Sequence, residues 1–115
     1  MDLAKYVGIE YSEMNCWELT RLFYKDVFDI ELKNIISDPK DRKATENLIY
    51  STKGEFKKIE SPEFGDIILI KIRGIESHIA VYLGEGLMLH TSETTGSVID
   101  RIDRWGKTIT GYFRP

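Results

Sequence analysis

HIAVYLGEGLMLHTS, residues 78–92, contains two apolar runs separated by a Gly-Glu-Gly triplet at positions 84–86. Short runs rich in Ile, Val, Leu and Tyr favour β-strands, and a glycine-rich break between two of them predicts an antiparallel hairpin. We expect a three-residue loop, because such a loop needs at least one positive backbone angle and glycine adopts it readily. Leu83 then pairs with Leu87 across the hairpin.

This hairpin carries both histidines of the chain. With a three-residue loop, Ala80 faces His90 and His78 faces Ser92. The two imidazoles then become diagonal neighbours on one face, with their backbones roughly 7 to 8 Å apart. A two-residue loop would shift the register by one position and place the imidazoles on opposite faces. The odd loop is therefore the condition for any chemistry that needs both rings.

The segments around the hairpin predict helices first and strands afterwards. Further strand-like runs occupy residues 65–72, 98–102 and 108–115. Amphipathic helices are predicted at 16–28, where apolar residues recur at helical spacing, and at 40–51. We expect one α+β domain over residues 1–115, with N-terminal helices packed on a C-terminal antiparallel sheet or partly open barrel.

The lone cysteine, Cys16, opens the first predicted helix. Asn15 is a favoured N-cap, and Glu18 follows three residues later, where its carboxylate can complete a capping box. A helix N-terminus and a nearby imidazolium both favour the thiolate, which is the nucleophilic form of cysteine. We expect Cys16 as nucleophile, His78 as its base and His90 as the residue that orients the base. The Cys16 N–H is expected to help hold an oxyanion.

Cysteine and histidine also have plainer roles in folded proteins. A free cysteine is more often a small buried hydrophobe, and a strand histidine is more often a satisfied core or surface residue. One cysteine and two histidines also supply three of the four ligands of an open zinc site. The chain has no CxxC, HxxxH or HExxH spacing, so we favour thiol chemistry and expect no metal and no cofactor.

Composition narrows the classes of partner. The 115 residues are 42% hydrophobic and 30% charged, which is a globular balance. A formal net charge of -3 gives no electrostatic reason to bind nucleic acid or an anionic membrane surface. No segment approaches the roughly 20 apolar residues of a membrane span, and the N-terminus shows no signal-peptide core. We expect no membrane insertion and no export by the usual route.

Four segments carry a resemblance to a known family. They are MNCWELTRLFYKDVFDIEL (14–32), FGDIILIKI (64–72), SHIAVYLGEGLMLHT (77–91) and RWGKTITGYFRP (104–115). Together they resemble the NlpC-type cell-wall cysteine peptidases, particularly the phage-associated branch. The resemblance implies a papain-like α+β fold that hydrolyses peptide bonds in peptidoglycan stem peptides, typically next to γ-D-glutamate.

The resemblance also implies roles for particular residues. Cys16, His78 and His90 match the Cys, His and third polar residue of the family, and Tyr11 matches a tyrosine that lines the substrate pocket. Glu18 stands where the family commonly has Gly, so its carboxylate either raises the pKa of the thiol or only completes the capping box.

The phage branch further implies a location and partners. We expect a tail-tip or tail-assembly component with other phage tail proteins as partners. It would sit in the virion tail, be assembled in the host cytoplasm and act in the cell wall; a chain of non-phage origin would be cytoplasmic. Two alternatives are a structural tail or docking module with little hydrolysis, and acyl transfer to an acceptor other than water.

Overall fold

The computed structural model describes residues 2–32 and 56–115 of the chain, so the helix predicted at 40–51 lies outside the described residues. The helical elements are η1 (Ala4–Tyr6), α1 (Cys16–Phe28) and η2 (Ile102–Thr108). The strands are β1 (Lys57–Ile59), β2 (Ile67–Ile72), β3 (Ile75–Gly84), β4 (Leu87–Ser92), β5 (Gly96–Arg101) and β6 (Ile109–Arg114).

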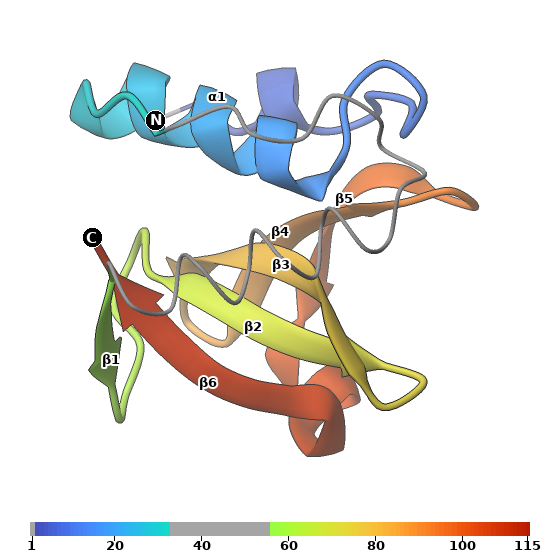
Figure 1. Ribbon diagram of the computed structural model, residues 1–115. Helices are drawn as coiled ribbons and strands as arrows, with labels where there is room; N and C mark the ends of the chain where they lie inside the picture. The colour runs from blue at the N-terminus through green and yellow to red at the C-terminus, as the bar shows by residue number, and fades with distance from the viewer. Residues whose placement is uncertain (1, 33–55) are drawn as a thin grey trace.

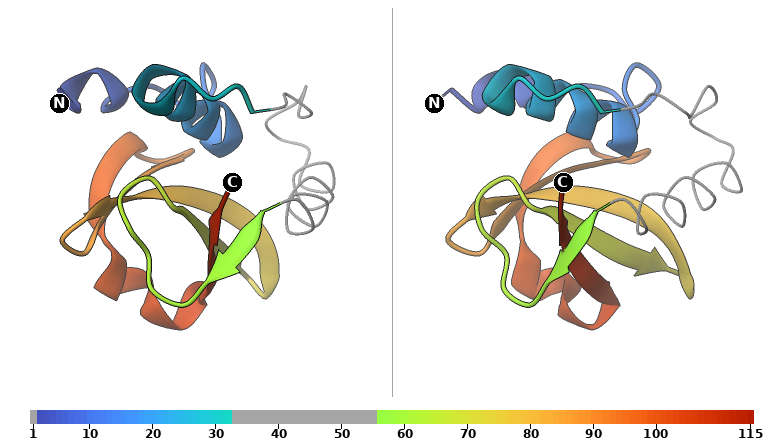
Figure 2. Two further views of the ribbon diagram at one scale, coloured as in Figure 1. Left: turned by 90° about the vertical axis from the view of Figure 1, so that its left-hand side faces the viewer. Right: turned by 60° about the vertical axis from the view of Figure 1, so that its left-hand side comes forward.

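The strands form one antiparallel sheet in the order β1-β6-β2-β3-β4-β5. The sheet curves strongly but stays open, because β1 and β5 each pair with a single neighbour (Figure 2). Helix α1 lies across one face of the sheet, over β3 and β4 (Figure 1). The predicted α+β class, with helical structure packed on a C-terminal antiparallel sheet, is confirmed.

Helix α1 begins as the sequence predicts. The Asn15 side chain accepts a hydrogen bond from the Glu18 N–H at 2.8 Å, and the Glu18 carboxylate accepts from the Asn15 N–H at 3.4 Å. This reciprocal pair is a capping box, so two N–H groups that the helix cannot use are satisfied. Cys16 is the first helical residue, as expected.

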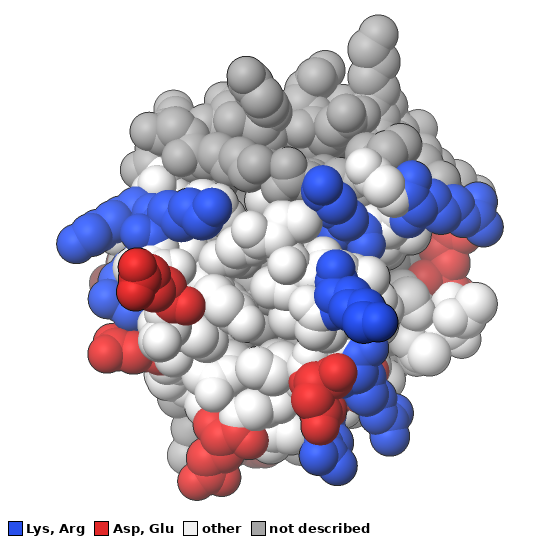
Figure 3. Space-filling model, turned by 90° about the horizontal axis from the view of Figure 1, so that it is seen from below, with Lys and Arg blue, Asp and Glu red and all other residues white. Residues whose placement is uncertain are grey.

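Alternation along the strands separates two apolar clusters, one on each face of the sheet. The cluster beneath α1 is rich in aromatic rings and includes Tyr6, Cys16, Trp17, Leu19, Phe23, Tyr24, Ile67, Leu69, Ile79, Val81, Leu89 and Phe113. The opposite cluster is smaller and consists of Ile68, Ile70, Ala80 and Met88, covered by Tyr82, Ile102, Trp105, Ile109 and Tyr112. Seen from that side, uncharged side chains fill the centre of the face and charged ones lie around them (Figure 3).

The loop of the central hairpin differs from the prediction. Gly84 pairs with Leu87, so only Glu85 and Gly86 lie between the strands, and the predicted three-residue loop is wrong. Both loop residues have positive φ, 53° and 77°, which is the backbone of a type I′ turn. Such a turn matches the right-handed twist of the strands, and this explains why the shorter loop is preferred.

A β-bulge nevertheless preserves the predicted register. The ladder shifts between Tyr82 and Gly84, so that Leu83 is the extra residue on β3. Below the bulge, Tyr82 pairs with Met88 and Val81 with Leu89, which are the pairs that a three-residue loop would give. The two histidines therefore keep a common face, for a reason that differs from the predicted one.

Two polar contacts near the start of β2 join this strand to β6 and to helix α1. The Arg114 guanidinium forms a two-pronged ion pair with the buried carboxylate of Asp66, with both N···O distances at 2.8 Å. The Tyr24 hydroxyl of α1 donates to the carbonyl of Gly65, the preceding residue. Buried charge is tolerated where it is paired in this way, so the Gly-Asp and terminal Arg-Pro segments have a structural role.

Candidate active site

The imidazoles of His78 and His90 are in direct contact. Nε2 of His78 lies 3.1 Å from Nδ1 of His90, and the ring planes are nearly perpendicular at 83°. Both side chains are buried, with 6% and 3% of their surface exposed. The predicted juxtaposition of the two rings is therefore observed, as a hydrogen bond from β3 to β4.

Trp105 of η2 covers this pair. Its indole stacks on the His78 ring with centroids 6.0 Å apart, and it meets the His90 ring nearly edge-on at 5.2 Å. Because Trp105 packs on the cluster opposite α1, the paired imidazoles also lie on that face of the sheet. Cys16 belongs to the cluster on the other face, beneath α1, so its pairing with His78 stays a prediction.

Cys16 belongs to the cluster beneath α1, and only 4% of its surface is exposed. The backbone N–H of Ile79, the residue that follows His78, is near enough to the thiol to act on its pKa. The Tyr82 N–H points toward β2, where it donates to Asp66, so by alternation the Ile79 N–H points toward β4. The paired ladder of β3 and β4 ends at Val81, which leaves this N–H for the thiol.

Burial controls the protonation of the thiol. It raises the pKa of Cys16 above its ordinary value, and the N–H groups of Ile79, Trp17 and Cys16 itself act in the opposite direction. The helix N-terminus and the imidazole were expected to favour the thiolate, but desolvation outweighs these effects here. The Glu18 carboxylate has the smallest effect of those that raise or lower this pKa, because its main interaction is the capping box.

The imidazoles are neutral near pH 7 for the same reason. Burial, and then the neighbouring ring of His90, lower the pKa of His78 to about 3. Burial also lowers the pKa of His90, against an opposing effect from Asp100. The thiol and its expected base are thus both uncharged in the absence of substrate.

Asp100 of β5 is a member of the site that the sequence prediction missed. Its Oδ2 lies 3.5 Å from Nε2 of His90 and accepts a hydrogen bond from Nε1 of Trp105 at 3.2 Å. Nε2 of His90 is buried and makes no hydrogen bond among the described residues, so the carboxylate of Asp100 acts on it by charge. The sequence could have indicated this residue, because a tight turn at 93–95 in the second hairpin places Asp100 opposite Met88 and diagonal to His90.

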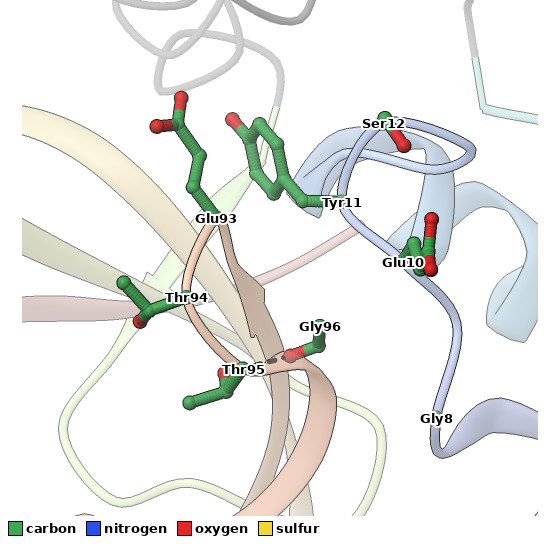
Figure 4. Close-up of a pocket in the computed structure, with 8 residues that line it drawn as sticks. All are labelled: Gly8, Glu10, Tyr11, Ser12, Glu93, Thr94, Thr95 and Gly96. Carbon is green, nitrogen blue, oxygen red and sulfur yellow. Dashed lines mark hydrogen bonds between the residues drawn. The ribbon is translucent and has the colours of Figure 1, made fainter.

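A pocket of about 510 Å³ lies between the segment that precedes Cys16 and the turn that follows the strand of His90. It is lined by Gly8, Glu10, Tyr11, Ser12, Glu93, Thr94, Thr95 and Gly96. Figure 4 shows segment 8–12 on one side of it and the turn between β4 and β5 on the other. This turn directly follows the strand of His90, and segment 8–12 leads into the N-cap of Cys16, so both walls join elements of the site.

A close backbone approach holds the pocket walls together. The N–H of Gly8 donates to the Ser97 carbonyl and the Ser97 N–H donates to the Ile9 carbonyl, both at 2.9 Å. Gly96 has φ 67°, and a Cβ there would lie 2.8 Å from the Ile9 carbonyl oxygen. Glycine is therefore required at this position, and the position of the Tyr11 segment is fixed relative to β5.

Comparisons with known proteins agree with this architecture. The NlpC/P60 family model matches residues 5–114. The crystal structure of the NlpC/p60 domain of the peptidoglycan hydrolase SagA superposes with a TM-score of 0.67 at 17% identity, covering 97% of this chain and 92% of that one. A lipoprotein-like protein of the NLP/P60 family from Staphylococcus aureus gives a TM-score of 0.62 at 21% identity, covering 96% of this chain.

The fold is that of an α+β domain in which the N-terminus of a helix meets an antiparallel sheet. With a family match over nearly its whole length, the chain belongs to the NlpC/P60 family. It spans 37% of the length of the Staphylococcus aureus protein, and no match was found among curated proteins.

Metal ligands do not cluster in the part of the chain that the structure describes. Within 2–32 and 56–115, no group of three or more His, Cys, Asp or Glu side chains is arranged to hold a metal ion. In the same ranges, no helix has the length and apolar character needed to cross a bilayer.

Proposed function

We propose that this protein is a cysteine peptidase that hydrolyses peptide bonds in peptidoglycan stem peptides. Membership of the NlpC/P60 family supports the class of enzyme. The observation that carries the proposal is the placement of the Cys16 thiol against the Ile79 N–H, directly beside the residue whose imidazole is paired with His90.

In the proposed reaction, the chain starts with a neutral thiol and a neutral imidazole. His78 takes the proton of the Cys16 thiol as the sulfur attacks the carbonyl carbon of the scissile bond. The negative oxygen of the tetrahedral intermediate is held by the backbone N–H of Cys16 at the first helical turn. The intermediate then collapses, the C–N bond breaks, and the leaving amine takes the proton from His78.

Water completes the cycle. His78 removes a proton from the water that attacks the thioester, and it returns this proton to the sulfur as the acid product leaves. Attack on the thioester by an amine in place of water would give acyl transfer. The mass of the product separates the two outcomes, because hydrolysis adds the elements of water and transfer adds the acceptor.

The pocket beside the site supports a peptide substrate. Tyr11 offers an apolar ring with a polar tip, and Glu10 and Glu93 place carboxylates in the same lining. Carboxylates suit the amino group of a stem peptide, and we propose Tyr11 as a substrate-binding residue. Tyr11→Ala is expected to raise KM more than it lowers kcat.

Digestion of muropeptides tests the proposal. The purified chain should release stem fragments, and Cys16→Ala should release none above background. Cys16→Ser is the matched control, because it replaces the thiol by a hydroxyl of similar size, which is a much poorer nucleophile. Equal release by the native chain and Cys16→Ala would sink the proposal.

A second candidate, a structural or docking module with the same fold, is favoured by the burial of Cys16 and its raised pKa. A structural buried cysteine resists alkylation near neutral pH. Alkylation of the native chain no faster than that of a free model thiol, together with no muropeptide cleavage, would support this candidate.

We also propose a place in a phage tail, acting on the cell wall with other tail proteins as partners. This proposal rests on the resemblance of the four sequence segments to the phage-associated branch. Immunodetection of the chain in purified virions tests it. Its absence from virions, with recovery of the chain from the host cytoplasm, would reject the tail location.

A further inference from the structure

Asp100 lies on the edge strand β5, and both oxygens of its carboxylate make polar contacts. Its Oδ1 accepts from the Arg101 N–H at 2.8 Å and lies 3.5 Å from the Arg104 guanidinium. Its Oδ2 points inward, accepts from the Trp105 indole at 3.2 Å and lies 3.5 Å from Nε2 of His90. One oxygen therefore faces the surface and the other faces the buried imidazole.

The chemistry of these groups decides where the protons lie. An ionised carboxylate only accepts hydrogen bonds, and a neutral imidazole carries one N–H and one acceptor nitrogen. Nε2 of His90 lies 3.5 Å from Oδ2 of Asp100 and makes no hydrogen bond within the described part of the chain. The nearby carboxylate can only accept, so it favours the N–H on Nε2. Nδ1 of His90 is then an acceptor.

The proton of the second ring follows from that of the first. Nδ1 of His90 lies 3.1 Å from Nε2 of His78, and a hydrogen bond between two nitrogens needs one donor. Because Nδ1 of His90 accepts, Nε2 of His78 must donate. The remaining nitrogen of His78, Nδ1, is left without a proton and can act as a base.

We propose that Asp100 is a positioning residue that sets the tautomers of both imidazoles, through a chain from Asp100 to His90 to His78, so that Nδ1 of His78 is the basic nitrogen. Trp105 holds the carboxylate in place with its N–H and excludes water by covering both rings. The benefit to catalysis rests on the proposed function, whereas the tautomers themselves do not depend on it.

Nuclear magnetic resonance of the imidazole nitrogens tests this directly. The chain has only two histidines, so protein labelled with nitrogen-15 in histidine gives a spectrum with no other rings. Near neutral pH, both rings are expected as the Nε2–H tautomer, with Nδ1 unprotonated. A proton on Nδ1 of His90 in the native chain would overturn the proposal.

Variants separate the positioning role from a structural one. Asp100→Ala removes the acceptor and should convert His90 to a mixture of tautomers, whereas Asp100→Glu should restore the native pattern. Arg104→Gln is the matched control, since Arg104 is exposed and contacts only the outer oxygen of Asp100. Unchanged imidazole signals in folded Asp100→Ala would also overturn the proposal.

Trp105→Phe keeps the ring cover and removes only the indole N–H, so it remains informative if Asp100→Ala does not fold. It should broaden or partly shift the His90 signals. Kinetics add a second readout: Asp100→Ala should lower kcat by about 100-fold with little change in KM. Native tautomers as predicted, but no cleavage of muropeptides by the native chain, would reject the proposed function and leave this inference standing.

Discussion

The two faces of the sheet are built differently. Beneath α1, aromatic rings share one apolar cluster with the buried thiol of Cys16, and the ring of Phe23 contacts those of Tyr6, Tyr24 and Phe64. On the opposite face, a smaller apolar cluster surrounds a polar chain of two imidazoles and a carboxylate. The proposed nucleophile is thus positioned by apolar packing, and its proposed base by hydrogen bonds.

One strand ladder ends close to His78 in the chain. The paired ladder of β3 and β4 ends at Val81, and the Ile79 N–H beyond it reaches the Cys16 thiol from the strand that carries His78. A fully paired ladder would use this N–H within the sheet. The thiol on one face is therefore affected by the backbone of the strand whose His78 side chain lies on the other face.

Removal of the base should have the largest effect on function and leave the helix face intact. His78→Gln keeps a polar side chain and should lower kcat for muropeptide cleavage by about 10² to 10⁴. Circular dichroism checks that the fold is kept. Retention of more than half of the native rate would show that the imidazole pair is not part of the reaction.

Removal of the central ring beneath α1 should have the largest effect on stability. Phe23 is fully buried, so Phe23→Ala leaves a cavity and should lower the free energy of unfolding by about 3 to 5 kcal/mol. Phe28, with 38% of its surface exposed, is the comparison, and Phe28→Ala should cost clearly less. Urea denaturation measures both values, and equal losses would contradict the packing described here.

Acid should destabilise the protein by protonating His78, which lies on the face opposite α1. The pKa of His78 falls from 6.5 in the unfolded chain to about 3 in the folded one, so the folded state binds fewer protons between these values. The contribution of the neutral His78 imidazole to stability is therefore fully present above pH 6.5 and is lost progressively as the pH drops toward 3. His78→Gln should show a shallower slope in urea titrations over this range, and an unchanged slope would be evidence against a buried neutral imidazole.

The smallest effect is expected at the helix N-cap, next to Cys16. Asn15→Ala removes the acceptor for the Glu18 N–H and should cost about 1 kcal/mol in urea denaturation. Asn15→Asp keeps an acceptor and should be close to native in stability. Equal losses in the two variants would mean that the capping bond contributes nothing measurable.

The sequence predicts what depends on local pattern. The capping box at Asn15 follows from two residue types at fixed spacing. The shared face of the two histidines is also predicted, but from a loop of odd length that the structure does not have. The predicted loop length is wrong because a type I′ turn with a bulge at Leu83 gives the same register as a longer loop. The predicted register is therefore correct only because the bulge at Leu83 offsets the shorter turn.

Contacts between distant segments lie beyond prediction from local pattern. Asp100 and Trp105 reach the imidazoles only because β5 pairs with β4 and η2 then crosses the face opposite α1. The burial of Cys16 depends on which face of the sheet the helix covers, and an amphipathic pattern alone does not specify this. Both the fourth polar residue of the site and the raised pKa of the thiol are therefore tertiary effects.

The dependence of the thiol on the imidazole is the most direct test of the proposed chemistry. The rate of alkylation of Cys16 by iodoacetamide would be compared, near neutral pH, between the native chain and His78→Gln, with Arg104→Gln as control. If His78 takes the proton of the thiol, as proposed, we expect a marked drop in rate for His78→Gln and a native rate for Arg104→Gln. Equal rates in all three proteins would contradict this role of His78.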